Sequence, residues 1–139
     1  MLPFVLDASV ALSWFLRDES TIGTDRLLSE ATDHGALAPS IWTLEVGNAL
    51  LVAERRNRLD AEQRRRALGA LKAMAVTLDS ETLDHVWERT LLLAQTYGLT
   101  LYDATYLELG IRSSLPLATL DKALAAAARK AGARLALSV

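Results

Sequence analysis

Four acidic residues stand at positions where a carboxylate can do chemistry. Asp7, Asp103 and Asp121 each follow a short apolar segment, and each has a residue type that commonly begins a helix. Glu45 instead falls within a predicted helix, on the apolar stripe defined by three- and four-residue spacing. Because an unpaired glutamate is almost never buried, we expect Glu45 either to pair with an arginine or to line a cleft as a ligand or acid/base group.

Together, the four carboxylates predict a site for a divalent cation. Asp7 and Asp121 would lie at the carboxyl ends of strands in one sheet, with Asp103 and Glu45 on helices packed near that edge. Carboxylates that converge on one cleft repel one another unless a cation neutralises them. Oxygen ligands select a hard ion, so we expect Mg²⁺, for which Mn²⁺ can substitute. The two histidines are isolated and cysteine is absent, so nothing indicates zinc.

Short apolar runs alternate with longer stretches of helical spacing, and these predict the elements that must position the acids. Strands are expected at 3–6, 36–38, 75–78, 117–119 and 134–137. Helices are expected at about 8–16, 20–33, 40–57, 60–73, 80–97, 103–113 and 121–131, with carboxyl-terminal caps at Gly35, Gly98 and Gly132. Strands separated by helices favour an α/β fold with a central, mostly parallel sheet.

The composition bounds the class of protein. The chain has 139 residues, of which 51% are hydrophobic and 23% charged, and this fits a single globular domain over 1–139. Its net charge of -2 means that any nucleic acid must be held by a local patch. The absence of cysteine fits a reducing cytoplasm, and no apolar run resembles a signal peptide or reaches the length of a membrane span.

The segments around the four acids carry a family resemblance. They are Asp7-Ala-Ser9, Glu45-Val-Gly-Asn48-Ala-Leu, Tyr102-Asp103-Ala-Thr-Tyr106-Leu and Ala118-Thr119-Leu-Asp121. In their order and spacing they resemble the PIN-domain ribonucleases, specifically the VapC-like toxins of type II toxin–antitoxin systems, over nearly the full chain. The sequence departs from the pattern at none of the four acidic positions.

The resemblance implies a three-layer α/β/α sandwich and Mg²⁺-dependent endoribonuclease activity, in which metal-activated water hydrolyses RNA phosphodiester bonds. The catalytic and metal-binding residues would be Asp7, Glu45, Asp103 and Asp121. The residues that orient a carboxylate or a metal-bound water would be Ser9, Asn48 and Thr119. The resemblance also implies a small cognate antitoxin protein as partner, and a homodimer.

Two other classes of protein have to be weighed. A phosphoacceptor domain also places an aspartate after its first strand, but the dehalogenase pattern needs a second aspartate where this chain has Ser9, and a receiver domain needs an acidic pair near its start. A catalytically silent PIN-like module that only binds another protein would be favoured by the loss of an acid. None of the four acids is lost.

Basic residues crowd the region 55–72. Two interpretations stay open, a solvated helical face and a surface that contacts RNA phosphates. The predicted RNA-contacting residues are Arg55, Arg56, Arg64, Arg65 and Arg66.

The three tryptophans, Trp14, Trp42 and Trp87, are expected in the core. As an alternative, Trp14 and Phe15 would form part of a groove for an antitoxin segment.

Overall fold

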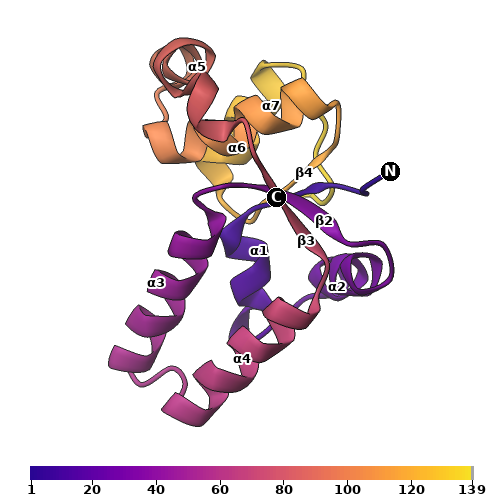
Figure 1. The fold of residues 1–139 in the computed structure, drawn as a ribbon, viewed down its shortest axis with the longest axis vertical. Helices are drawn as coiled ribbons and strands as arrows, with labels where there is room; N and C mark the ends of the chain where they lie inside the picture. Colours follow the sequence, from indigo (N-terminus) through magenta and orange to yellow (C-terminus); the bar gives the residue numbers. More distant parts are fainter. Residues whose placement is uncertain (139) are drawn as a thin grey trace.

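The computed structural model describes residues 1–138, and its centre is a four-stranded parallel sheet (Figure 1). The last residue of the predicted domain 1–139 lies outside this described part. The strands lie in the order β3 (Val76–Asp79), β2 (Ala36–Pro39), β1 (Val5–Leu6) and β4 (Leu117–Ala118). Val5 pairs with Leu37 on one side and Leu117 on the other, so β1 is an inner strand. Since all pairings are parallel, the carboxyl ends of the four strands share one edge.

Helices cover both faces of the sheet, which confirms the predicted three-layer α/β/α sandwich. Figure 1 shows α5, α6 and α7 on one side and α1 to α4 on the other. The helices are α1 (Ala8–Ser13), α2 (Ile22–His34), α3 (Trp42–Arg55), α4 (Ala61–Ala73), α5 (Leu91–Tyr97), α6 (Leu101–Ser113) and α7 (Lys122–Lys130). No helix within residues 1–138 is long and apolar enough to cross a membrane.

The glycine caps occur where the sequence predicts them. Gly35, Gly98 and Gly132 all have positive φ, at 79°, 66° and 79°. At Gly35 the turn from α2 into β2 also leaves no room for a side chain, because a Cβ there would lie 2.4 Å from the carbonyl oxygen of Ala75. Only glycine therefore fits the approach of this turn to the start of β3.

The predicted helix over 80–97 is interrupted. It divides into the 3₁₀ turn η2 (Thr82–His85), the π turn η3 (Val86–Thr90) and α5. The Thr82 hydroxyl donates to Oδ2 of Asp79 at 2.8 Å and accepts from the backbone N–H of Ser40 at 3.1 Å. These bonds anchor the first turn to the sheet edge, and the helical spacing of the sequence does not reveal them.

Several other predicted elements differ from the observed ones at their ends, and three of them need comment. The helix predicted at 8–16 ends at Ser13 and is followed by the 3₁₀ turn η1 (Arg17–Glu19). The helix predicted at 103–113 begins at Leu101, because the side chain of Thr100 caps it. The strand predicted at 134–137 is reduced to one parallel bridge between Leu135 and Leu117.

Two of the three tryptophans follow the prediction. Trp42 is buried, and Trp14 packs against the core while its Nε1 donates to the carbonyl of Thr24 at 2.9 Å. This hydrogen bond holds the Trp14 side chain inward, which argues against the alternative that Trp14 forms part of a groove for a partner. The prediction for Trp87 is wrong, because this side chain is 87% exposed on the π turn.

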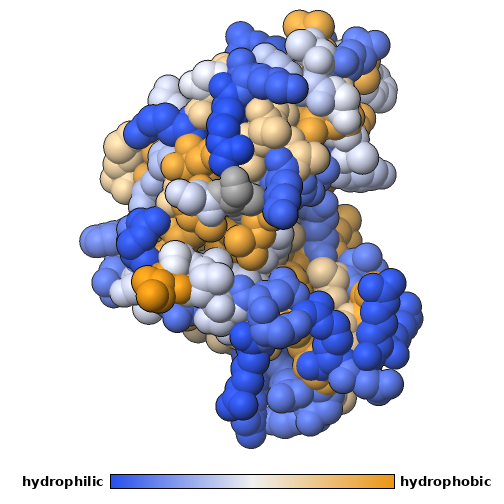
Figure 2. All heavy atoms as spheres, turned by 180° about the vertical axis from the view of Figure 1, so that it is seen from behind, coloured by the Kyte–Doolittle hydropathy of each residue, from blue (hydrophilic) through white to orange (hydrophobic). Residues whose placement is uncertain are grey.

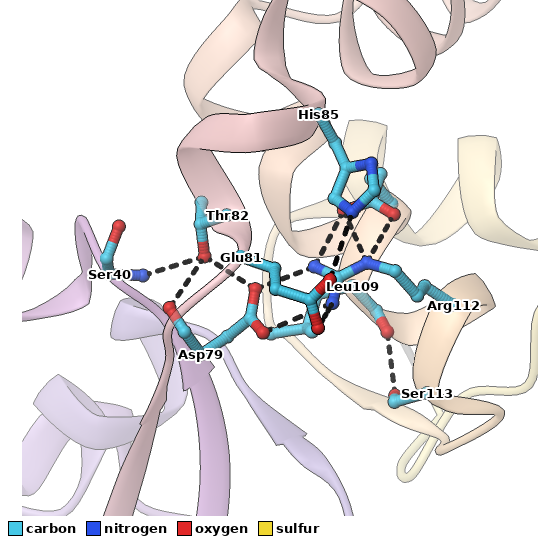
Figure 3. Close-up of polar contacts among 9 residues, drawn as sticks. Ser40, Asp79, Glu81, Thr82, His85, Leu109, Arg112 and Ser113 are labelled. Carbon is cyan, nitrogen blue, oxygen red and sulfur yellow. Dashed lines mark hydrogen bonds and ion pairs between the residues drawn. The ribbon is translucent and has the colours of Figure 1, made fainter.

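A charge cluster on Arg112 ties the end of β3 to α6 (Figure 3). Arg112 donates to the two oxygens of Asp79 at 3.1 and 2.6 Å, and its Nε donates to Glu108 at 2.9 Å. The Glu108 side chain is only 4% exposed. Burial alone would raise the pKa of Asp79, but hydrogen bonds from Arg112 and Thr82 hold that pKa below its ordinary value. The cluster therefore locks the outermost strand to the helix that carries Asp103.

Arg112→Ala should lower the free energy of unfolding by about 3 kcal/mol, because it leaves two poorly solvated carboxylates without their cation. Urea denaturation followed by tryptophan fluorescence measures this. The control is Arg66→Ala, whose side chain is 77% exposed in its ion pair with Glu62, and this variant should change stability by less than about 0.5 kcal/mol. Equal stability of the two variants would contradict a structural role for the cluster.

Candidate functional site

Asp7 lies between the inner strand β1 and the helix α1, and its carboxylate is nearly buried. It occupies the cap position of α1, yet its side chain makes no capping hydrogen bond. Instead, Oδ2 of Asp7 accepts from the hydroxyls of Ser9 at 2.5 Å and Thr119 at 2.7 Å. The carboxylate is therefore oriented by two neutral donors and does not serve the helix.

The segment after β4 is tied to the same place. The backbone N–H of Asp121 donates to the Thr119 hydroxyl at 3.0 Å, and the N–H of Leu120 donates to the Ser9 hydroxyl at 2.9 Å. The carboxylate of Asp121 caps α7, since its Oδ1 accepts from the N–H of Leu124 at 3.0 Å. Asp121 thus performs the capping role that the sequence suggested and remains at the sheet edge beside Asp7.

Glu45 projects from the first turn of α3, where it is half-buried. Its Oε1 accepts a hydrogen bond from the hydroxyl of Tyr106, a fully buried residue of α6. Within residues 1–138, Glu45 forms no ion pair with an arginine, so the structural pairing considered for it does not occur.

Asp103 lies three residues after the capping residue of its helix, Thr100. Thr100 caps α6, and the N–H of Asp103 donates to the Thr100 hydroxyl at 3.1 Å. Its carboxylate in the first turn is half-buried. Because Tyr106 follows three residues later, both side chains lie on neighbouring positions of one helix face.

The four carboxylates lie close enough to repel one another electrostatically. Burial raises the pKa of Asp7, Glu45 and Asp103 above their ordinary values, and neighbouring negative charges raise these pKa values further. The repelling neighbour is Asp121 for Asp7, and both Asp7 and Asp103 for Glu45. Asp121 and Asp7 repel Asp103. The structure therefore gathers all four predicted acids at one edge of the sheet.

The four carboxylates lie in one region but do not converge on a single position. Within residues 1–138, no group of three or more acidic or histidine side chains is placed so that it could hold a metal ion directly. In two of the acids one oxygen is engaged, and the other accepts no hydrogen bond from a side chain or backbone group identified above. These open oxygens are Oε2 of Glu45 and Oδ2 of Asp121.

The supporting residues divide into two groups. Ser9 and Thr119 contact Asp7, as described above. Asn48 is exposed on α3, and its side chain forms no hydrogen bond within the described part of the chain. Tyr106 was not among the predicted site residues, although its three-residue spacing from Asp103 was a signal available in the sequence.

The predicted RNA-contacting arginines lie on α3 and α4, which form a hairpin extending from the sheet (Figure 1). Hydrophilic side chains gather over the lower part of the molecule, where this hairpin ends (Figure 2). Arg64 pairs with Glu54, and both Arg65 and Arg66 pair with Glu62. Arg55 and Arg56 are exposed at the end of α3 and form no ion pair within residues 1–138. Of the five arginines, Arg55 and Arg56 therefore have the guanidinium groups most available to a polyanion. They lie about 15 Å along α3 from Glu45.

Comparisons with known proteins agree with this architecture. Ribonuclease VapC3 from Pyrobaculum aerophilum is 29% identical to this chain over 121 residues, which cover 87% of this chain and 91% of that protein. The crystal structure of PAE2754 from the same organism has a TM-score of 0.68 at 26% identity, covering 91% of this chain and 79% of that one. A toxin-antitoxin complex from Klebsiella pneumoniae shares the fold, with a TM-score of 0.56 at 20% identity over 85% and 86% of the two chains.

The family model of the PIN domain matches residues 4–130, a range that includes β1, β4 and all four carboxylates. This match confirms the resemblance carried by the motifs around the acids. The chain belongs to the PIN domain family.

Proposed function

We propose that this chain is an endoribonuclease that hydrolyses RNA phosphodiester bonds with the help of Mg²⁺, and that it is the toxin of a toxin–antitoxin pair. The observation that carries the proposal is the set of four mutually repelling carboxylates at one sheet edge. Membership of the PIN family and the name of the relative, a ribonuclease, support the reaction class.

The donor set fits a hard divalent cation. All four candidate ligands are carboxylates, and Glu45 and Asp121 each keep one oxygen open, as described above. Mg²⁺ retains several of its waters and binds through one or two protein carboxylates, so it does not need three ligands that already converge. Asp7 and Asp121, at neighbouring strand ends, are the proposed principal ligands, with Glu45 and Asp103 completing the site.

When bound, the ion would activate a water and neutralise the charge that develops on the leaving oxygen. The chain's own residues prepare for this. Ser9 and Thr119 hold the Asp7 carboxylate, and the α7 cap holds Asp121. Burial raises the pKa values of Glu45 and Asp103, and the neighbouring carboxylates raise them further, so a bound cation would relieve repulsion at both residues.

The rival interpretations are less well supported. A phosphoacceptor aspartate must be reached by its phosphodonor, whereas Asp7 is 7% exposed. A silent binding module would not need the ties that orient Asp7, Glu45 and Asp121.

An antitoxin partner is part of the proposal. A groove between α3, α4 and β3 is lined mainly by apolar side chains, among them Val46, Leu68, Leu71, Met74 and Leu78. Such a groove would accept the apolar side chains of a partner segment. The homodimer stays a prediction from the family resemblance, and the cytoplasmic location stays a prediction from the absence of cysteine.

The purified protein should cleave RNA with Mg²⁺ or Mn²⁺, but not in excess EDTA and not with Ca²⁺, whose coordination shell is larger and looser.

Asp7→Asn and Asp103→Asn should each abolish nearly all cleavage. Thr119→Val should reduce cleavage by about 10- to 100-fold, because it removes a hydroxyl that orients Asp7. The matched control is Asp33→Asn, the same change at an exposed position of α2, and it should cleave at the wild-type rate. Activity that persists in chelator would refute the mechanism.

In the absence of metal at neutral pH, Asp7→Asn should be more stable than the wild type by on the order of 1 kcal/mol, since it relieves a buried charge. Burial raises the folded-state pKa of Asp7 above the ordinary 3.8. Wild-type stability is therefore lost as the pH rises through that raised pKa, and the advantage of asparagine should disappear near pH 3, where both side chains are neutral. Urea denaturation in EDTA at pH 3, 5 and 7 measures the difference. An equal gain at all three pH values would show that charge is not its cause.

In cells, expression of the chain alone should arrest growth with loss of intact RNA. Glu45→Gln should not arrest growth, because it removes one anionic ligand while preserving the size of the side chain. Growth curves and total RNA compared at matched protein levels provide the measurement. Equal arrest by both proteins would favour the silent binding module.

A further inference from the structure

Tyr106 is completely buried, yet its hydroxyl reaches a carboxylate on another helix. Its exposed fraction is 0%, and the hydroxyl donates to Oε1 of Glu45, which belongs to α3. The charges of Asp7 and Glu45 both act on the phenol, so its hydroxyl lies within the acidic site. None of the roles assigned to the four carboxylates explains why a tyrosine is placed there.

We propose that Tyr106 is a positioning residue, which holds the Glu45 carboxylate in the acidic site and leaves its Oε2 for the divalent cation. This inference rests on the proposed function, because it concerns how the same site receives its ion. Tyr106 itself would contact neither the ion nor the RNA.

Glu45 needs such a support more than the other acids do. Asp7 is held by two hydroxyls and Asp121 by the cap of α7. The longer Glu45 side chain is repelled by Asp7 and Asp103, and its half-exposed position lets it turn toward solvent. Tyr106 supplies the one hydrogen bond that opposes this movement within residues 1–138.

Tyr106 is well placed to provide a rigid support. A tyrosine has only two side-chain torsions, and complete burial leaves its ring little freedom. Its helix, α6, packs against β1, β2 and β4, so the sheet determines where the hydroxyl lies. The same helix carries Asp103 one turn earlier. Tyr106 thereby fixes Glu45 relative to a second ligand as well as to the sheet.

A simpler role must be separated from this one. A buried tyrosine hydroxyl requires a hydrogen-bond partner, and Glu45 could merely satisfy it. On that account, loss of the hydroxyl would alter stability but not the affinity for a cation. Cation affinity therefore distinguishes the two roles.

The experiment is a titration with Mn²⁺, followed by the loss of the free-ion EPR signal, on wild type, Tyr106→Phe and Tyr97→Phe. Tyr97, a partly buried tyrosine of α5 that forms no hydrogen bond to a carboxylate within residues 1–138, is the matched control. Tyr106→Phe should weaken Mn²⁺ binding by about 10- to 100-fold, the usual effect of removing a residue that orients a ligand. Tyr97→Phe should bind Mn²⁺ like the wild type. In RNA cleavage, Tyr106→Phe should raise the half-saturating Mg²⁺ concentration and leave the rate at saturating Mg²⁺ near that of wild type.

A second variant tests the contact from the other side. Glu45→Asp keeps the charge but withdraws it from the tyrosine hydroxyl by one methylene, and adding Tyr106→Phe to it should weaken Mn²⁺ binding no further. Equal Mn²⁺ affinity of wild type and Tyr106→Phe would overturn the positioning role while the proposed nuclease stands. Additive losses in the double variant would overturn it too. A wild-type protein that binds no Mn²⁺ would overturn the proposed function itself.

Discussion

Carboxylates repel one another, and the repulsion grows as burial removes the water that screens them. This structure brings Asp7, Glu45, Asp103 and Asp121 together from four different segments of the chain. The ties that hold them are neutral hydroxyls and backbone N–H groups. None of the four carboxylates forms an ion pair within residues 1–138. The fold therefore orients these carboxylates, but within the described residues no positive side chain pairs with them.

The Arg112 cluster shows the opposite arrangement a short distance along the same helix. There, the nearly buried Glu108 and the carboxylate of Asp79 are compensated by one guanidinium. The two clusters share α6, which carries Asp103 and Tyr106 at one end and Glu108 and Arg112 at the other. The ion pairs of Arg112 stabilise one end of α6, and the other end carries the uncompensated charge of Asp103. For this reason we propose that a cation from solution is the partner of the four acids.

The sequence predicted the fold class, and the four acids that it singled out lie together at one sheet edge, because both depend on local signals. Apolar runs ending at Asp7 and Asp121 mark parallel strand ends, and Glu45 was conspicuous on an apolar stripe. Whether these acids bind a metal stays a prediction. The exposure of Trp87 was out of reach of local reasoning, and for Tyr106 the sequence offered only its three-residue spacing from Asp103. The outward position of Trp87 follows from a π turn, which comes directly after the 3₁₀ turn that Thr82 anchors. The proposed role of Tyr106 appears only when α3 and α6 are packed together.

The hydrogen bond between Thr119 and Asp7 joins residues 112 positions apart in the chain. A ribosome synthesises the protein from its amino terminus, so Asp7 emerges long before β4 exists to complete its surroundings. A nascent chain that ends before Thr119 lacks both the hydroxyl that orients Asp7 and the carboxylate of Asp121. The four carboxylates can therefore come together only after the chain has been synthesised through Asp121, long after Asp7 has emerged.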